Sequence, residues 1–132
     1  MKTLIQKAKF RTSPEKLYDL YMNAALHSAV TGAPAKITKK EGTSFSAHGS
    51  YVKGKNLKLV PKKLIVQSWR GSDWRDSETD SIFILSFKKI TEGTEIKLVH
   101  ANIPDRLVAS IDKGWKEFYW KKWGEYLRSN PQ

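Results

Sequence analysis

The sequence contains no cysteine, few arginines and no long apolar run, and each absence narrows what the protein can be. Without cysteine the chain can form neither a disulfide framework nor a thiolate metal site, which fits a reducing compartment. No apolar stretch approaches the roughly 20 residues needed to span a bilayer. Lysines interrupt the first ten residues too early for the apolar core of a signal peptide. We therefore expect a cytoplasmic protein.

The chain is strongly basic, with a net charge of +11 over 132 residues. Its 19 lysines far outnumber its 5 arginines, although arginine is the residue that clamps phosphates and reads bases through paired hydrogen bonds. The lysines are also spread along the chain, from Lys2 to Lys122. Solvated surfaces therefore explain the charge better than nucleic-acid binding, which stays an alternative based on charge alone.

The first 32 residues predict one strand and two short helices. Residues 1–10 read as a strand, with Leu4 and Gln6 on one of its faces. Ser13 can cap a helix that has Pro14 at its first position. Asn23 can cap a second short helix, which the sequence ends at Gly32.

The middle of the chain predicts an antiparallel meander, because short apolar stretches alternate there with turn residues. We expect strands at residues 35–38, 44–48, 50–60, 63–70, 80–89 and 94–101.

Residues 104–128 predict one long helix. Its stripe recurs at intervals of three and four residues and includes one lysine: Leu107, Ile111, Trp115, Phe118, Lys122 and Tyr126. Such a helix is about 37 Å long, enough to cross a small sheet. No other element could cover a sheet of about six or seven strands. We therefore predict a single α+β domain over residues 1–132, with a curved antiparallel sheet around this helix.

The sequence shows no catalytic or cofactor-binding motif. It has no GxSxG sequence, no phosphate-binding Walker loop and no dinucleotide fingerprint. The three histidines, His27, His48 and His100, do not belong to a close cluster of metal-ligating residues. We therefore expect no enzyme activity, no cofactor and no metal.

Short motifs follow one another in a characteristic order through most of the chain. They are Phe10-x-x-Ser13-Pro14-Glu15, Gly42-x-x-Phe45, Gly49 with Gly54, Leu59-x-Pro61, Trp69-Arg70-x-x-x-Trp74, Gly93-Thr94, His100-x-x-Ile103-Pro104 and Gly114-Trp115. This ordered set resembles the C-terminal domain of the activators of heat-shock protein 90 ATPase. The chain departs from the family at Gly71, where an aromatic residue is common, so we expect a different loop at 71–79.

The resemblance implies a START-like (SRPBCC) domain with a helix-grip fold and a cavity between the sheet and the long helix. It also implies a lipid or aromatic ligand in that cavity, a chaperone of the heat-shock protein 90 type as partner, or both. Eukaryotic members carry a separate N-terminal domain that makes most of the chaperone contact. The 132 residues contain no such domain, so we expect only slight ATPase activation, and we expect a monomer.

The residues expected to line the cavity come from the strands and the long helix. They are Trp69, Phe83, Leu85, Phe87, Leu98, Ile111, Trp115, Phe118 and Tyr119. Three polar candidates are Arg70 and His100, which lie in the family motifs, and Lys122. His100 could instead be a structural residue at a strand end, and Lys122 could extend along the helix to solvent.

Two further tryptophans of the long helix, Trp120 and Trp123, fall away from the centre of the stripe. They could form an exposed aromatic surface for a partner, since tryptophan is enriched at interface hot spots. They could equally be covered by other elements of the domain.

The leading hypothesis is a non-enzymatic domain that acts through its cavity, a protein partner, or both. A cyclase- or dehydratase-like enzyme is an alternative reached only by analogy within the superfamily.

Overall fold

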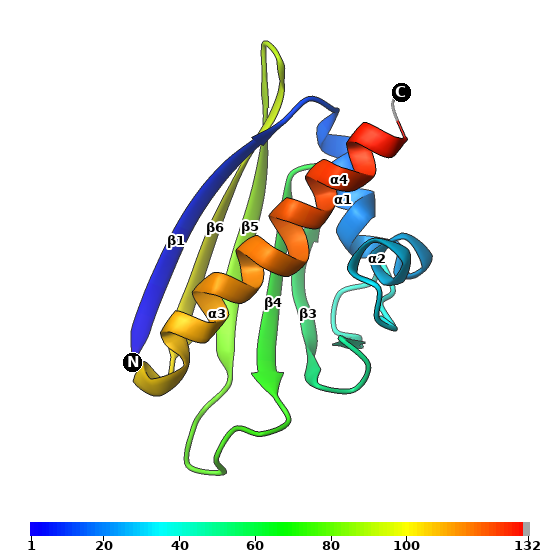
Figure 1. Ribbon diagram of the computed structural model, residues 1–132. Coiled ribbons are helices and arrows are strands. Elements are labelled where there is room, and N and C mark those ends of the chain that lie inside the picture. Colours follow the sequence, from blue (N-terminus) through cyan, green and yellow to red (C-terminus); the bar gives the residue numbers. More distant parts are fainter. Residues whose placement is uncertain (131–132) are drawn as a thin grey trace.

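The fold is built on one antiparallel sheet of six strands in the order β1-β6-β5-β4-β3-β2, in a computed structural model that describes residues 1–130 (Figure 1). The strands are β1 (Lys2–Phe10), β2 (Ser44–Ala47), β3 (Val52–Val60), β4 (Leu64–Gly71), β5 (Ser81–Ile90) and β6 (Gly93–Ile103). The α+β fold with a curved antiparallel sheet is confirmed. Residues 131 and 132 of the predicted domain lie outside the described residues.

The sheet has one buried and one solvated face because apolar and polar side chains alternate along its strands. In β6 the buried positions fall at every second residue from Thr94 to His100. The N-terminal strand β1 pairs with β6, with Leu4 opposite His100. The first and the last strands along the chain therefore lie side by side.

The two short helices are α1 (Pro14–Met22) and α2 (Ala24–Thr31), and both begin where the capping residues predict. Ser13 Oγ accepts a hydrogen bond from the Lys16 amide at 3.1 Å, and Asn23 Oδ1 accepts one from the Leu26 amide at 3.0 Å. Gly32 ends α2 in the left-handed conformation, with a φ of 80°, which glycine adopts without steric strain.

The predicted strand at 35–38 is wrong, since the segment makes only an isolated bridge between Lys36 and Ser46. The alternation that suggested a strand comes from burial of Ala35 and Ile37 in the core. Its backbone is held instead by a side chain, because Asn56 Nδ2 donates to the carbonyl of Thr38 at 2.7 Å. The buried side-chain amide of Asn56 therefore satisfies a backbone carbonyl of this segment that a neighbouring strand would otherwise satisfy.

The long C-terminal helix crosses the sheet diagonally and is continuous, as predicted (Figure 1). It begins with a 3₁₀ turn η1 (Asp105–Leu107) and continues through α3 (Val108–Trp115), a π-helical turn η2 (Lys116–Trp120) and α4 (Lys121–Ser129). The π turn closes its hydrogen bonds over five residues and so holds one more residue than an α-helical turn.

This extra residue changes which side chains face the sheet. An α-helix turns about 100° per residue, so one inserted residue moves all later side chains about 100° around the axis. The buried stripe runs at intervals of four residues: Ile111, Trp115, Tyr119 and Trp123. The predicted stripe is therefore wrong at Phe118, which is 49% exposed, and at Lys122, whereas Tyr126 is half-buried and packs against the core.

Candidate functional site

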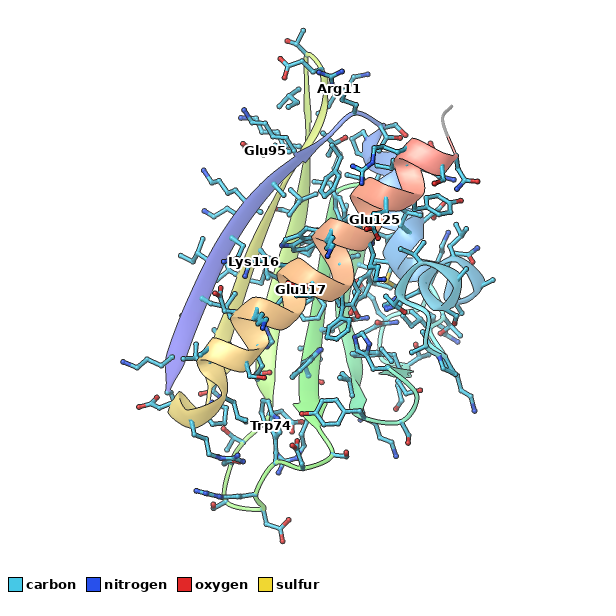
Figure 2. The ribbon with its side chains drawn as sticks, viewed as in Figure 1. Arg11, Trp74, Glu95, Lys116, Glu117 and Glu125 are labelled. Carbon is cyan, nitrogen blue, oxygen red and sulfur yellow. The ribbon has the colours of Figure 1, made fainter. Side chains whose placement is uncertain are left out.

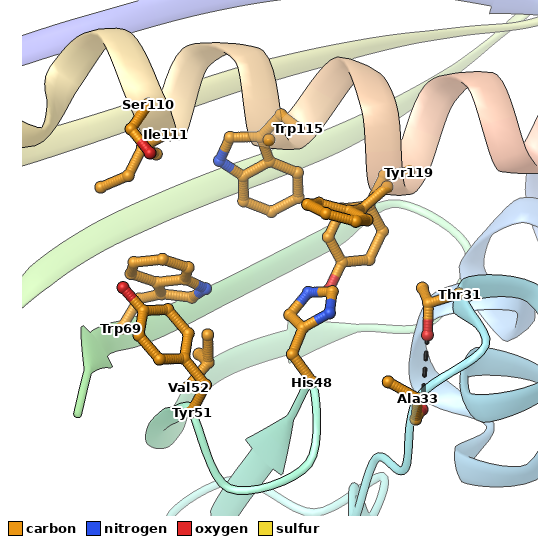
Figure 3. Close-up of a pocket in the computed structure, with 12 residues that line it drawn as sticks. Thr31, Ala33, His48, Tyr51, Val52, Trp69, Ser110, Ile111, Trp115 and Tyr119 are labelled. Atoms are coloured by element: carbon orange, nitrogen blue, oxygen red, sulfur yellow. Dashed lines mark hydrogen bonds between the residues drawn. The ribbon is translucent and has the colours of Figure 1, made fainter. Parts of the chain in front are cut away.

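A pocket of about 380 Å³ lies between the long helix, the beginning of β3 and the end of β4 (Figure 3). The helix forms its roof, the β2–β3 connection forms its floor and the end of α2 closes one side. Its lining residues are Thr31, Ala33, His48, Tyr51, Val52, Trp69, Ser110, Ile111, Gly114, Trp115, Phe118 and Tyr119.

Most of the pocket wall is apolar. Trp69 and Trp115 supply aromatic faces, and Val52 and Ile111 supply aliphatic ones. The hydroxyl of Thr31 is already engaged, since it donates to the carbonyl of His27 at 2.9 Å. A mainly apolar pocket with few polar groups is typical of small-molecule binding sites.

The main polar feature of the wall is His48, whose backbone has a φ of 53°. A residue with a side chain adopts this left-handed conformation only when the surrounding structure holds it there, at a cost of about 1–3 kcal/mol. The following residue, Gly49, is also left-handed, with a φ of 72°. The turn that joins β2 to β3 therefore directs an imidazole into the pocket.

His48 belongs to a chain of hydrogen bonds whose direction is fixed from its buried end. His27 Nδ1 donates to the carbonyl of Tyr21 at 2.8 Å, because a carbonyl can only accept. His27 Nε2 must then accept from the Tyr119 hydroxyl, 3.0 Å away. The Tyr119 oxygen in turn accepts from His48 Nε2, also at 3.0 Å. His48 Nδ1 is thus left as an acceptor with no partner among residues 1–130.

Burial keeps these three groups neutral near pH 7. It lowers the pKa of His27 to about 4 and also lowers the pKa of His48. It raises the pKa of Tyr119 above the usual value for a phenol. Desolvation is the leading cause in each case, since burial disfavours the charged form. The chain can therefore orient a hydrogen-bonding ligand without adding charge to the pocket.

A second directed chain links the helix to the sheet beside the pocket. The indole nitrogen of Trp115 donates to His100 Nδ1 at 3.0 Å, so the other ring nitrogen of His100 carries the proton. His100 Nε2 donates to Ser81 Oγ at 2.8 Å, and Ser81 donates to the carbonyl of Trp69 at 2.7 Å. Burial lowers the pKa of His100 to about 3. The geometry matches a structural role, because both ring nitrogens are satisfied inside the protein.

The structure brings five of the nine predicted cavity residues together: Trp69, Ile111, Trp115, Phe118 and Tyr119. The other four, Phe83, Leu85, Phe87 and Leu98, do not line the pocket and are buried in the core. They project from the centre of the sheet, where the helix packs on them, whereas the pocket opens near the ends of β3 and β4.

The polar candidates Arg70 and Lys122 both lie outside this pocket. The guanidinium of Arg70 donates to the carbonyls of Glu78 and Arg75 and pairs with Asp80, so it holds the β4–β5 loop. Lys122 is on the outer side of the helix, rotated away from the sheet by the π turn.

The tryptophans expected at the helix margin are covered by neighbouring elements. Trp123 is 1% exposed and packs edge-on against Phe10 of β1, so of the two alternatives left open by the sequence, cover by other elements holds for Trp123. Trp120 is half-buried, and its indole nitrogen donates to Gln6 Oε1 at 2.6 Å. The ring of Trp120 also stacks on the ring of Trp115, with the ring centroids 5.5 Å apart. The π turn allows this contact between residues that are five positions apart.

Three lining residues, Ala33, His48 and Tyr51, come from connections between elements, whereas the predicted strands at 44–48 and 50–60 included His48 and Tyr51 and were wrong at these two residues. The one available signal was the motif glycine at position 49, which marks the tight turn after His48. No group of three metal-ligating side chains exists within the described part of the chain. Among the same residues, no helix is long and apolar enough to cross a bilayer.

A curved antiparallel sheet that grips a long helix defines the START-like, helix-grip class of domains. Within this class the chain belongs to the family described as Activator of Hsp90 ATPase homolog 1-like protein, whose model matches residues 11–128.

Curated relatives support this assignment. An activator of 90 kDa heat shock protein ATPase homolog from Dictyostelium discoideum is 31% identical over 118 residues, which cover 87% of this chain and 30% of the relative. The human homolog 1 is 32% identical over 115 residues, covering 87% of this chain and 34% of the human protein. The chain thus spans about a third of the length of these relatives.

Solved structures support the fold. An HSP90 activator from Plasmodium falciparum superposes with a TM-score of 0.84 at 22% identity, covering 90% of this chain and 91% of that one. An Aha1 from Colwellia psychrerythraea, determined as a dimer, gives 0.77 at 16% identity and covers 92% of each chain.

Proposed function

We propose that this protein is a non-enzymatic binding domain whose pocket takes a small, mainly apolar molecule with one hydrogen-bond donor. The observation that carries the proposal is the apolar pocket of about 380 Å³ with His48 in its wall, whose Nδ1 has no hydrogen-bond partner among residues 1–130.

Two contributions would hold such a ligand. Burial of apolar surface against Trp69, Trp115 and Ile111 contributes about 25 cal/mol for each Å² removed from water. A hydroxyl or N–H of the ligand would donate to His48 Nδ1, which fixes the orientation of the ligand. The imidazole is held in place by Tyr119, so little freedom is lost on binding.

The enzymatic alternative is less well supported by the same groups. The titratable side chains that line the pocket are His48, Tyr51 and Tyr119, and the Tyr51 hydroxyl is engaged, since it donates to Asp73 at 2.8 Å. The proton of Tyr119 is donated to His27, away from the pocket, and burial makes both histidines weaker bases. A general acid–base pair needs pKa values nearer the working pH.

Two glycines of the long helix offer a matched test of the pocket. A Cβ at Gly114 would meet only the Phe118 ring, at 3.9 Å, and would point toward the pocket that Gly114 lines. A Cβ at Gly124 would meet only the end of the Arg128 side chain, at 3.5 Å, outside the pocket. Either Gly→Leu change should improve helix propensity by roughly 1 kcal/mol.

The experiment is an NMR titration of the protein with a panel of phenols, indoles and fatty acids. We expect saturable shifts at Trp115 and His48, an affinity at least tenfold weaker in Gly114→Leu, and unchanged affinity in Gly124→Leu. No saturable shift for any compound, or equal affinities in the two variants, would overturn the proposal.

A second candidate function is docking on a chaperone of the heat-shock protein 90 type, which the names of the relatives favour. A basic protein of net charge +11 also suits a carboxylate-rich chaperone surface. We expect salt-sensitive binding and slight ATPase stimulation. A flat calorimetric titration with the chaperone at low ionic strength would remove this candidate. The cytoplasmic location of this protein stays a prediction.

A further inference from the structure

The outer face of the sheet, turned away from the long helix, carries an ordered pattern of side chains. We call it the convex face. In Figure 2 Glu95 of β6 projects from the sheet, and its neighbours Thr94 and Ile96 are buried on the other side. Because side chains alternate along strands, the register of the sheet gives the rows on this face.

One row of the convex face is apolar across four strands. Ile5 stands opposite Val99, Val99 opposite Ile84, and Ile84 opposite Val66. Ile5 is 62% exposed, and Ile84 and the nearby Ile82 are each 41% exposed. Single exposed apolar residues are ordinary, but a contiguous row on a solvated sheet face marks an interaction site.

Basic side chains flank this apolar row on both sides. Lys7 stands directly opposite Lys97 in the β1–β6 pair, and Lys53 directly opposite Arg70 in the β3–β4 pair. Like charges at directly opposite positions destabilise a sheet. The Lys7–Lys97 pair is therefore unfavourable for the isolated protein, whereas the charge of Arg70 in the second pair is compensated by Asp80, 3.3 Å away.

Glu95 stands opposite Lys9 and Lys88 on this face, but four other lysines have no carboxylate partner in the described part of the chain. Within residues 1–130 no ion pair is made by Lys7, Lys53, Lys55 or Lys97. On the long helix Lys116 pairs with Asp112 and Lys121 with Glu117, whereas Lys113 and Lys122 make no ion pair within the described residues. The four lysines of the sheet face are therefore available to the carboxylates of a partner.

A groove of about 640 Å³ lies at one end of the convex face, over β2, β3 and β4. Its rim carries cations and hydroxyl groups: Lys36, Ser44, Ser46, Lys53, Lys55, Ser68 and Arg70. The one carboxylate on it, Asp80, is paired with Arg70 at 3.3 Å. The groove therefore adds donors for anionic groups beside the apolar row.

We propose that the convex face docks an acidic protein surface in which carboxylates flank a short apolar segment. The apolar row would bury that segment, and the two basic flanks would meet its carboxylates. This surface is distinct from the pocket under the long helix and goes beyond the ligand proposal.

Other occupants fit the face less well. A second copy of this chain would bring its own lysines against these lysines. Single-stranded nucleic acid needs exposed aromatic rings for stacking, and the rows of this face contain none. A membrane surface favours protruding aromatic or leucine side chains, whereas these are isoleucine and valine set within strands.

The test uses two double variants with the same change in net charge. Lys53→Glu with Lys97→Glu reverses charge on both flanks and converts each like-charged pair into an opposite-charged one, so the sheet should remain folded. Lys113→Glu with Lys121→Glu makes the matched change on the long helix. The probe is a synthetic peptide of alternating glutamate and leucine. Its binding is measured by NMR titration of the protein at low salt and at 0.5 M salt.

We expect shifts centred on Ile5, Ile84 and Val99, at least tenfold weaker binding in the sheet variant, and less than twofold change in the helix variant. Gly114→Leu should bind the peptide normally, which separates this proposal from the pocket. Equal losses in both double variants would overturn it. So would tighter binding of a DNA duplex or of phosphatidylserine vesicles at the same face.

Discussion

The indole nitrogen of Trp115 and Nδ1 of His100, 3.0 Å apart, form a hydrogen bond that ties the long helix to the centre of the sheet. Both residues are buried, and the bond continues through Ser81 to the backbone of β4. The bond fixes the rotation of the helix above the sheet, and with it the roof of the pocket.

Replacing Trp115 by phenylalanine should therefore lower the free energy of unfolding by more than the loss of side-chain volume alone would. The variant leaves His100 Nδ1 as a buried acceptor without a donor, which adds about 1–3 kcal/mol to the loss in free energy of unfolding. Trp123→Phe is the control, because Trp123 is equally buried and makes no side-chain hydrogen bond among the described residues. Urea denaturation measures both, and equal losses would contradict the role of the bond.

The stability of the protein should fall between pH 7 and pH 5. His27 and His100 have pKa values lowered to about 4 and about 3, so both stay neutral in the folded protein. In the unfolded chain they bind protons below about pH 6.5. The unfolded state therefore gains protons as the pH falls, and stability is lost by roughly 2 kcal/mol for each histidine across this window.

This pH window separates the histidines from the carboxylates. Glu78, whose pKa the Arg106 hydrogen bond lowers to about 2, affects stability only below about pH 5, where it becomes protonated in the unfolded chain. Urea midpoints at pH 7, 6 and 5 provide the measurement, with His100→Gln as the comparison variant of shallower slope. A flat profile in this range would contradict the assignment of neutral buried histidines.

Deletion of Phe118 should be tolerated, although it removes a residue from the middle of a helix. Without Phe118 the π turn can close as an α-helical turn, and Trp123 then lies seven residues after Trp115, on the same face. We expect a loss below about 1.5 kcal/mol in free energy of unfolding. Deletion of Lys113, in the α-helical part, should unfold the protein because it rotates Trp115 and Trp123 off the sheet. Circular dichroism melts distinguish the two.

A buried polar bridge should show strong coupling in a double-mutant cycle. Tyr21 of α1 donates to Gln67 Oε1 at 2.7 Å, and Gln67 donates to Asn56 Oδ1 at 2.7 Å. Tyr21→Phe and Gln67→Met should each cost about 1–3 kcal/mol, and the double variant should cost at least 1 kcal/mol less than their sum. Additive losses would show that the hydrogen bond contributes little.

Local signals in the sequence were sufficient for most of the fold. Alternation predicted all six observed strands near their positions, apart from the ends, and one strand, at 35–38, that does not form. Capping by Ser13 and Asn23 predicted where two helices begin. These signals depend on neighbours a few residues apart, so they can be read without knowing the tertiary structure.

The candidate site was predictable only where it lies on regular elements. Trp69, Ile111, Trp115, Phe118 and Tyr119 were found by periodicity or resemblance. His48 and Tyr51 were missed because the turn that presents them depends on backbone conformation, with His48 at positive φ.

The sequence by itself determined an α+β domain with one long, tryptophan-rich helix over an antiparallel sheet, and it determined the basic charge. Tertiary structure decided which side of that helix is buried. The π turn shifts the phase of the helix by one residue, which buries Trp123 and exposes Phe118. Tertiary structure also decided that lysines from distant strands stand side by side on the convex face. Strand register joins residues far apart in the chain, and no local pattern encodes that pairing.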